Sequence, residues 1–186
     1  MPSNYEPPKL AIPVRELDHS AGPADAPVVL VEFGDYQCPH CGAAYPVVQQ
    51  VQKKLGSKLR FVFRNFPLTY AHPQALWAAE TVEAAAAQGK FWEMHDFVFE
   101  HQPSLGQPAV FLQEAKRLGL DAKRIEREVS NHTHLARIQD DYSGGIRSGV
   151  NGTPTFFIQG VRYDGAPDVA PLVAALQSSA KAPRRK

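Results

Sequence analysis

The sequence is poor in cysteine: only two of its 186 residues are Cys, which excludes a scaffold held together by several disulfides. It has no run approaching the roughly 20 apolar residues of a membrane-spanning helix, so we expect no membrane insertion. Neither sign of charge is in excess, because 20 basic and 19 acidic residues leave a net charge of +1. This balance predicts no nucleic-acid-binding surface.

The chain does contain enough apolar material for a core. Hydrophobic residues make up 44% of the sequence, and the length suits one domain with a large insertion. Residues 1–13 are polar and rich in proline, so a flexible N-terminal lead is expected there. Residues 181–186 form a short basic tail, which we expect to be exposed to solvent.

Both cysteines stand at the start of a predicted helix. The apolar run Val28–Phe33 predicts a strand buried on both faces, and the helix follows after a short turn. Cys38 occupies the N-cap position and Pro39 the first helical position, where its fixed φ is favourable. Free N–H groups of the first turn and the helix dipole favour an anion at Cys38, so its pKa should fall. A protonated His40 would add positive charge beside it.

Cys41 lies three residues after Cys38, roughly 5–6 Å away in helix geometry, which nearly suits a disulfide. The pair is therefore predicted to be redox-active, with Cys38 as the attacking or attacked sulfur and Cys41 as the resolving one. Two alternatives remain open, a metal site that uses both thiolates and a structural disulfide. A disulfide that closes so short a loop constrains little of the unfolded chain and would stabilise little.

Hydrophobic periodicity predicts the other elements. A short first strand is expected at Val14–Leu17, a helix at Pro39–Leu55 and an alternating strand at Lys58–Phe66. The region 71–150 is predicted to be almost entirely helical, in the segments 73–87, 90–100, 109–118, 122–129 and 132–148. Strands at 156–159 and 161–163 and a last helix at 168–178 complete the prediction.

Four motifs resemble one known family. They are Gly22-Pro23-x-x-Ala26-Pro27, the C-P-H-C segment 38–41, Phe66-Pro67-Leu68, and V-N-G-T-P-T-F-F at 150–157. Together they are similar to bacterial DsbA-like thioredoxins over about residues 13–178. The resemblance implies an α/β thioredoxin fold, a central mixed sheet flanked by helices, with a large all-helical insertion. It divides the chain into a thioredoxin-fold domain, residues 14–70 and 151–180, and an inserted helical subdomain, residues 71–150.

The resemblance also implies roles for residues outside the dithiol. Glu32 resembles the buried acid beneath the dithiol of thioredoxins, and a carboxylate of raised pKa there could accept the Cys41 proton. The alternative is a Glu32 that points outward or pairs with a lysine. Pro154 resembles the cis-proline that packs against the dithiol, and Thr153 would bind an extended peptide through its backbone. Pro39 is assigned to the same substrate-binding surface.

Other polar residues are not expected to take part. Asp35 is predicted to be a loop residue, although it lies close to the cysteines in the sequence. The six histidines other than His40 are expected to have surface or packing roles. No metal and no organic cofactor is predicted.

The predicted function is disulfide exchange with cysteine-containing protein substrates, in the oxidase direction, by a monomer. A redox partner protein or a low-molecular-weight thiol would complete the cycle. A cytosolic reductase, an isomerase, a thiol-based metal-binding protein and a glutathione-dependent transferase on the same fold are the alternatives. No signal peptide is evident, so the chain as written is expected in the cytoplasm; after removal of a leader it would be periplasmic or otherwise extracytoplasmic.

Overall fold

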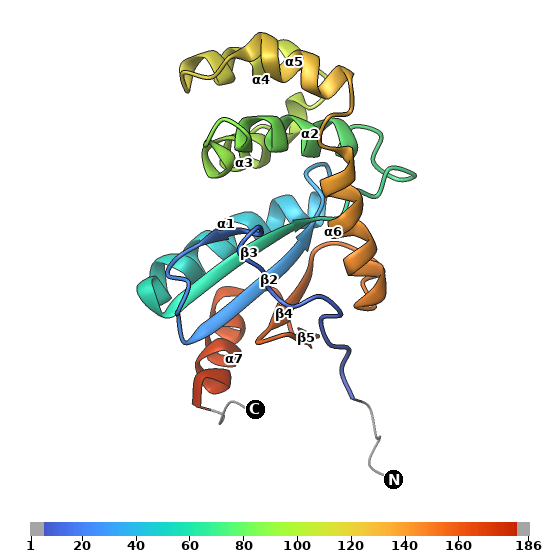
Figure 1. The fold of residues 1–186 in the computed structure, drawn as a ribbon. Coiled ribbons are helices and arrows are strands. Elements are labelled where there is room, and N and C mark those ends of the chain that lie inside the picture. The colour runs from blue at the N-terminus through green and yellow to red at the C-terminus, as the bar shows by residue number, and fades with distance from the viewer. Residues whose placement is uncertain (1–5, 182–186) are drawn as a thin grey trace.

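The centre of the molecule is a five-stranded mixed sheet (Figure 1), seen in a computed structural model that describes residues 6–181. Its strands are β1 (His19–Ala21), β2 (Val28–Gly34), β3 (Leu59–Asn65), β4 (Thr155–Ile158) and β5 (Val161–Tyr163). They lie in the order β1-β3-β2-β4-β5. β2 and β3 run parallel, and every other neighbouring pair is antiparallel.

Helices surround this sheet. Helix α1 (Pro39–Leu55) links the two parallel strands, and Gly56, whose φ is +51°, ends it. Between β3 and β4 lie α2 (Ala75–Ala86), α3 (Phe91–Glu100), η2 (Gln102–Ser104), α4 (Pro108–Arg117), α5 (Ala122–Ser130) and α6 (Leu135–Arg147). Helix α7 (Val169–Lys181) comes after β5. The mixed sheet with a long helical segment between β3 and β4 is the predicted architecture.

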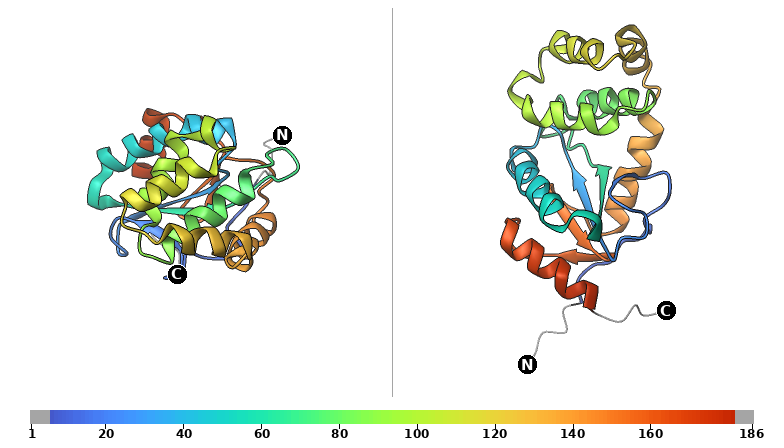
Figure 2. Two further views of the ribbon diagram at one scale, coloured as in Figure 1. Left: turned by 90° about the horizontal axis from the view of Figure 1, so that it is seen from above. Right: turned by 90° about the vertical axis from the view of Figure 1, so that its left-hand side faces the viewer.

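The two faces of the sheet carry separate clusters of buried side chains. Leu30 of β2 belongs to the larger cluster, which also contains α1 and α7 residues such as Val48 and Leu172. The next residue, Val31, points to the other face and packs in a smaller cluster beside Tyr142 of α6. Figure 2 accordingly shows α1 and α7 on one side of the sheet and α6 on the other.

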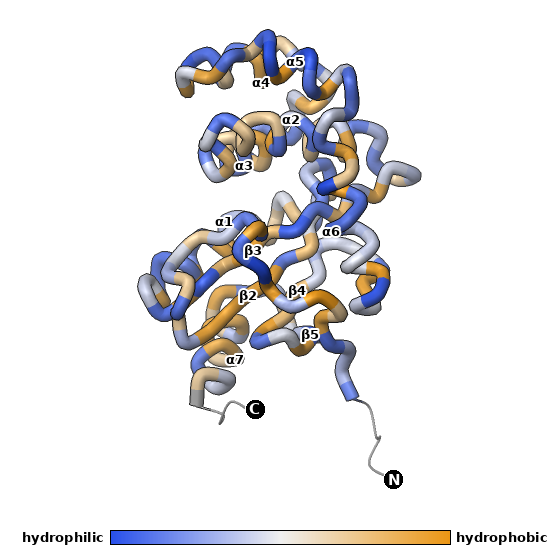
Figure 3. The backbone as a smooth tube through the Cα atoms, viewed as in Figure 1, coloured by the Kyte–Doolittle hydropathy of each residue, from blue (hydrophilic) through white to orange (hydrophobic). Residues whose placement is uncertain are grey.

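The remaining helices form two layers beyond the sheet. Figure 1 shows α2 and α3 next to the sheet, and α4 and α5 stacked on them at greater distance. The backbone is more hydrophilic along α4 and α5 than along β2 and β3 (Figure 3). Within residues 6–181, no helix is both long enough and apolar enough to cross a membrane.

The prediction of a first strand at Val14–Leu17 is wrong. The chain makes a turn there, and the first strand is β1, which begins at His19. Asp18 explains the difference, because its carboxylate accepts the N–H of Arg15 at 2.7 Å and thereby closes the turn. Pairing with β3 begins only after this turn, at His19.

Residues 6–13, predicted as part of a flexible lead, are hydrogen-bonded to the domain. Lys9 forms an isolated antiparallel β-bridge with Val161. Beside it, the N–H of Leu10 donates to the Gly160 carbonyl at 2.8 Å. These contacts add an extended segment beside β5. Residues 1–5 and the predicted basic tail from residue 182 onward lie outside the described residues.

A buried ion pair ties this N-terminal segment to β3. Nη2 of Arg64 lies 2.9 Å from Oδ2 of Asp18, and neither side chain is more than 3% exposed. The same guanidinium donates to the carbonyls of Ile12 and Pro13, each at 2.9 Å. Burial alone would raise the Asp18 pKa, but the hydrogen bonds from Arg64 and from the Arg15 N–H outweigh it and lower that pKa.

We expect Arg64→Met to lower the free energy of unfolding by about 3–5 kcal/mol, because it leaves the Asp18 carboxylate buried without its partner. Urea unfolding would measure the loss. Lys90→Met is the control, since Lys90 pairs with Glu93 and both side chains are at least 40% exposed; its cost should stay within about 1 kcal/mol. Equal losses in the two variants would contradict the role given to the buried pair.

Candidate active site at the start of helix α1

The two cysteines occupy the first turn of α1, as predicted. Cys38 is the N-cap residue, with extended backbone angles (φ −65°, ψ 123°), and Pro39 stands at the first helical position. Both cysteines are free thiols. Cys41 is completely buried, whereas Cys38 is 3% exposed and is followed by the exposed residues Pro39 and His40. The pair is therefore asymmetric, with one sulfur at the edge of the surface and one in the core.

Cys38 is the more acidic of the two thiols. The neighbouring Cys41 thiol contributes most to lowering its pKa, burial opposes this, and the Cys38 pKa settles at about 5. Thr153 and the backbone N–H groups of Cys41 and His40 add to the decrease. Neither N–H completes a side-chain cap hydrogen bond to the sulfur, so their contribution is that of oriented dipoles. In this structure His40 thus contributes through its backbone, while its ring is exposed.

The opposite holds for Cys41, whose pKa lies well above its usual value. Burial is the main cause, and the thiol of Cys38 and the carboxyl of Glu32 act in the same direction. The N–H of Asp35, which donates to Cys41 Sγ at 3.4 Å, opposes the increase only in part. At neutral pH the dithiol therefore carries its negative charge on Cys38.

Glu32 is buried rather than directed to solvent, with 3% of its surface exposed. It lies two residues after Leu30 on β2 and so faces the same side of the sheet, where α1 packs. Its partners on the adjacent strands are Phe63 and Phe156. Burial between these aromatic residues and the charge of Cys38 raise the Glu32 pKa to about 8.

The loop before β4 packs against the outer sulfur. The Thr153–Pro154 peptide bond is cis, the isomer expected from the sequence. In its protonated form, Cys38 Sγ donates to the Thr153 carbonyl at 3.4 Å. The Thr153 hydroxyl is buried and makes no hydrogen bond within the described protein, but it lies close enough to Cys38 to lower the pKa of that thiol.

Sequence reasoning missed two residues that hold the turn. Asp35, predicted as a loop residue, accepts the N–H groups of Gln37 at 2.8 Å and Cys38 at 3.2 Å. Gln102 of η2 donates to the carbonyls of Tyr36 and Cys38, at 2.8 and 3.1 Å. An Asp three residues before a predicted N-cap is a signal for such a turn. Gln102 carries no comparable signal, because it lies more than 60 residues away in sequence.

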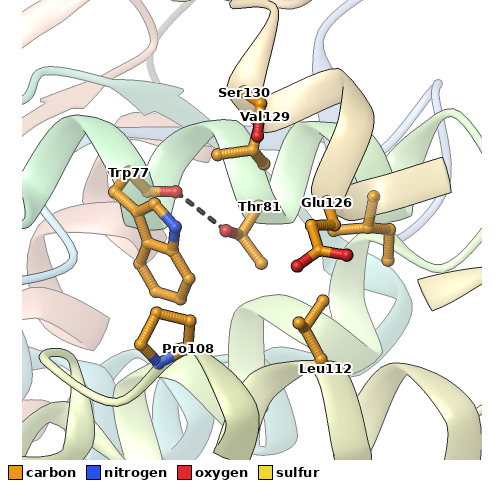
Figure 4. A pocket seen from close by; sticks show the side chains of 8 residues that line it. Trp77, Thr81, Pro108, Leu112, Glu126, Val129 and Ser130 are labelled. Atoms are coloured by element: carbon orange, nitrogen blue, oxygen red, sulfur yellow. Dashed lines mark hydrogen bonds between the residues drawn. The ribbon is translucent and has the colours of Figure 1, made fainter. Parts of the chain in front are cut away.

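A pocket of about 220 Å³ lies elsewhere in the molecule, between α2, α4 and α5. Figure 4 shows the side chains of Trp77, Pro108 and Leu112 around it. None of its lining residues belongs to the turn or the loop around the cysteines. Among residues 6–181, no group of three or more His, Cys, Asp or Glu side chains is arranged to hold a metal ion.

Comparison with known sequences places this site in a family. The family described as Thioredoxin matches residues 15–178, and the chain therefore belongs to it. The chain is also 44% identical over 171 residues to a Na⁺/H⁺ antiporter NhaA 1 of Salinispora arenicola. This match covers 91% of the chain and 26% of the antiporter. An antiporter NhaA of Herminiimonas arsenicoxydans is 36% identical over 169 residues. The chain thus spans about a quarter of the length of these relatives.

Solved structures share the fold over almost the whole chain. Oxidised BdbD from Bacillus subtilis superposes with a TM-score of 0.81 at 22% identity, covering 95% of this chain and 97% of BdbD. For α-DsbA1 from Wolbachia pipientis the TM-score is 0.78 at 21% identity, with 92% and 94% covered. A thioredoxin-like oxidoreductase from Silicibacter pomeroyi is 26% identical, with a TM-score of 0.74 and coverage of 89% and 94%. The predicted DsbA-like thioredoxin fold is confirmed.

We expect Thr153→Val to raise the Cys38 pKa by about half to one unit, because the variant loses a hydroxyl dipole beside the thiolate while the backbone is retained. A pH titration of thiolate ultraviolet absorbance in the reduced protein would measure the shift. Thr81→Val is the control, since Thr81 is also buried but its hydroxyl donates to the Trp77 carbonyl within α2. An unchanged midpoint in Thr153→Val, or an equal shift in both variants, would rule out this role.

Proposed function

We propose that this chain exchanges disulfides with protein cysteines through Cys38 and Cys41, as a thiol:disulfide oxidoreductase that favours the oxidase direction. The observation that carries the proposal is the difference between the two sulfurs. Cys38 has a pKa of about 5 at the edge of the surface, and Cys41 has a raised pKa in the core. Such a pair has one sulfur that a substrate can reach and one that reacts only internally.

The reaction begins with the Cys38–Cys41 disulfide. A substrate thiolate attacks Cys38 Sγ, a mixed disulfide forms, and Cys41 leaves and takes up a proton. A second substrate thiolate then attacks the substrate sulfur of the mixed disulfide and releases Cys38 as a thiolate. Two electrons have passed from the substrate dithiol to the enzyme, which a redox partner protein or the disulfide form of a small thiol must reoxidise.

The proposed direction follows from the thiolate. Stabilisation of the Cys38 anion favours the reduced enzyme and makes Cys38 a good leaving group, so the disulfide is a strong oxidant. A reductase would need a less stabilised thiolate at this position. An oxidant of this kind would act outside the reducing cytosol, in contrast to the cytoplasmic location expected from the sequence as written.

Glu32 is proposed as the group that exchanges a proton with Cys41. It faces α1 on the buried side of β2, and both groups have raised pKa values. In a mixed disulfide Cys38 carries no charge, which removes one of the two causes of the raised Glu32 pKa. The carboxyl therefore becomes easier to ionise at the stage when Cys41 must lose its proton to attack.

Substrates would bind beside the cis Thr153–Pro154 bond, where the Thr153 carbonyl lies 3.4 Å from Cys38 Sγ and the exposed Pro39 follows Cys38 in the chain. The backbone of Thr153 is suited to pair with an extended peptide. We infer a monomer and no bound cofactor. The proposal does not extend to the ion antiport in the relatives' name, since the chain matches only about a quarter of those proteins.

Substitution of each cysteine separates their roles. Cys38→Ser should abolish oxidation of a reduced protein substrate, because the accessible sulfur is lost. Cys41→Ser should accumulate mixed disulfides that survive non-reducing electrophoresis, because the resolving thiol is missing. Equal and partial losses in both variants would contradict the assignment.

The reduction potential of the wild type against glutathione tests the direction: a value at or below that of the glutathione pool would overturn the oxidase proposal.

Glu32→Gln should slow attack of Cys41 on a mixed disulfide near neutral pH and leave the first attack on Cys38 little changed. Stopped-flow measurement of the two steps would separate them, with Glu93→Gln as a surface control.

The raised Glu32 pKa also predicts how stability depends on pH. The folded protein keeps a proton on Glu32 between pH 4.5, the usual pKa of a Glu, and about pH 8. The contribution of this group to wild-type stability therefore falls as pH rises through that window. Glu32→Gln should lack this fall.

A further inference from the structure

Asp35 is the most heavily hydrogen-bonded carboxylate near the cysteines. Oδ1 accepts the N–H groups of Gln37 and Cys38, as described above. Oδ2 accepts the N–H of Leu68 and pairs with Nδ1 of His72, both at 2.8 Å. The Asp35 side chain is fully buried, and that of His72 is 18% exposed. Four donors thus converge on one carboxylate.

These hydrogen bonds join the two loops that follow the parallel strands. Asp35 comes directly after β2, and Leu68 and His72 lie in the loop between β3 and α2. A second link runs beside the first, because the Gln37 side chain accepts the N–H of Gln74 at 2.6 Å. The turn that presents Cys38 is therefore held by the loop after β3.

The arrangement creates an electrostatic problem as well as a rigid turn. An ionised Asp35 lies within hydrogen-bond distance of the Cys38 backbone and would disfavour a second anion on the adjacent sulfur. Its partner must donate through Nδ1, because a carboxylate only accepts. Protonation of Nε2 as well would make His72 an imidazolium, and the pair would then be neutral.

We propose that Asp35 and His72 act as one positioning unit, in which Asp35 holds the turn of Cys38 and the imidazolium of His72 cancels the carboxylate charge beside the sulfurs. Neither residue touches the substrate in this account. The inference rests on the proposed function only for its purpose, since the charge compensation is a property of the reduced protein alone. It assigns a role to two residues for which the sequence predicted none.

The test is a double-mutant cycle on the Cys38 thiolate, titrated by ultraviolet absorbance in the reduced protein. His72→Gln keeps a side-chain donor but removes the charge, so the Cys38 pKa should rise by about half to one unit. Asp35→Asn should not raise it, because the negative charge is gone. The double variant should return close to the Asp35→Asn value. In equilibrium with glutathione, His72→Gln should favour the disulfide by about three- to tenfold, or up to about 30 mV.

His134→Gln is the matched control. His134 pairs with Glu128 at the same distance of 2.8 Å and has the same side-chain exposure of 18%, but it lies between α5 and α6. It should lower stability at most and leave the Cys38 pKa unchanged. Circular dichroism would confirm that each variant is folded, and His72→Gln alone still tests the charge if Asp35→Asn does not fold.

Two results would overturn the proposal. The first is a Cys38 pKa that does not change in His72→Gln. The second is an increase that persists in the double variant, which would mean that His72 acts only through packing. Failure of the proposed function looks different: the wild type would not exchange reversibly with glutathione, whereas the thiolate titration would still report on the pair.

Discussion

The structure depends on how it distributes negative charge in a nearly dry site. Glu32, Asp35, Cys38 and Cys41 are each 3% exposed or less, and all four can ionise. Buried anions lose solvation and repel one another, so they cannot all be charged together. The hydrogen-bond donors around each sulfur decide where the charge lies. The Cys41 thiol contributes most to the low pKa of Cys38, with smaller contributions from Thr153 and two backbone N–H groups, whereas the N–H directed at Cys41 does not offset the burial of that thiol. Protons therefore remain on Glu32 and Cys41 near neutral pH.

This distribution suits a dithiol cycle, in which the site gains and loses one negative charge at a time. Three parts of the fold produce this charge distribution. They are the start of α1, which presents Cys38, the strand β2, which buries Glu32, and the loop before β4, which brings Thr153 to the sulfur of Cys38. The helical region between β3 and β4 also holds the turn, because the side chain of Gln102 in η2 donates to the carbonyls of Tyr36 and Cys38. The helices between β3 and β4 are thus connected directly to the site.

Much of the fold could be predicted because its signals are local. The apolar run of β2, the alternation in β3 and the proline at the start of α1 each determine their own element within a few residues. The first strand was misplaced because the turn that precedes it depends on Asp18, whose main partner, Arg64, is 46 residues away. The contact between Asp35 and His72 could not be predicted for the same reason, since the two residues lie in different loops.

The sequence by itself determined the Cys38–Cys41 dithiol, its position at a helix N-terminus, and the place of Glu32 on a buried strand. These follow from residue type and short spacing, which act through local backbone geometry and the helix dipole. Only the tertiary structure decided which sulfur is buried, how far Glu32 is removed from water, and which groups surround the turn. Burial is the main cause of the raised pKa values of Glu32 and Cys41. It depends on segments that lie far apart in the sequence and that only the folded chain brings together.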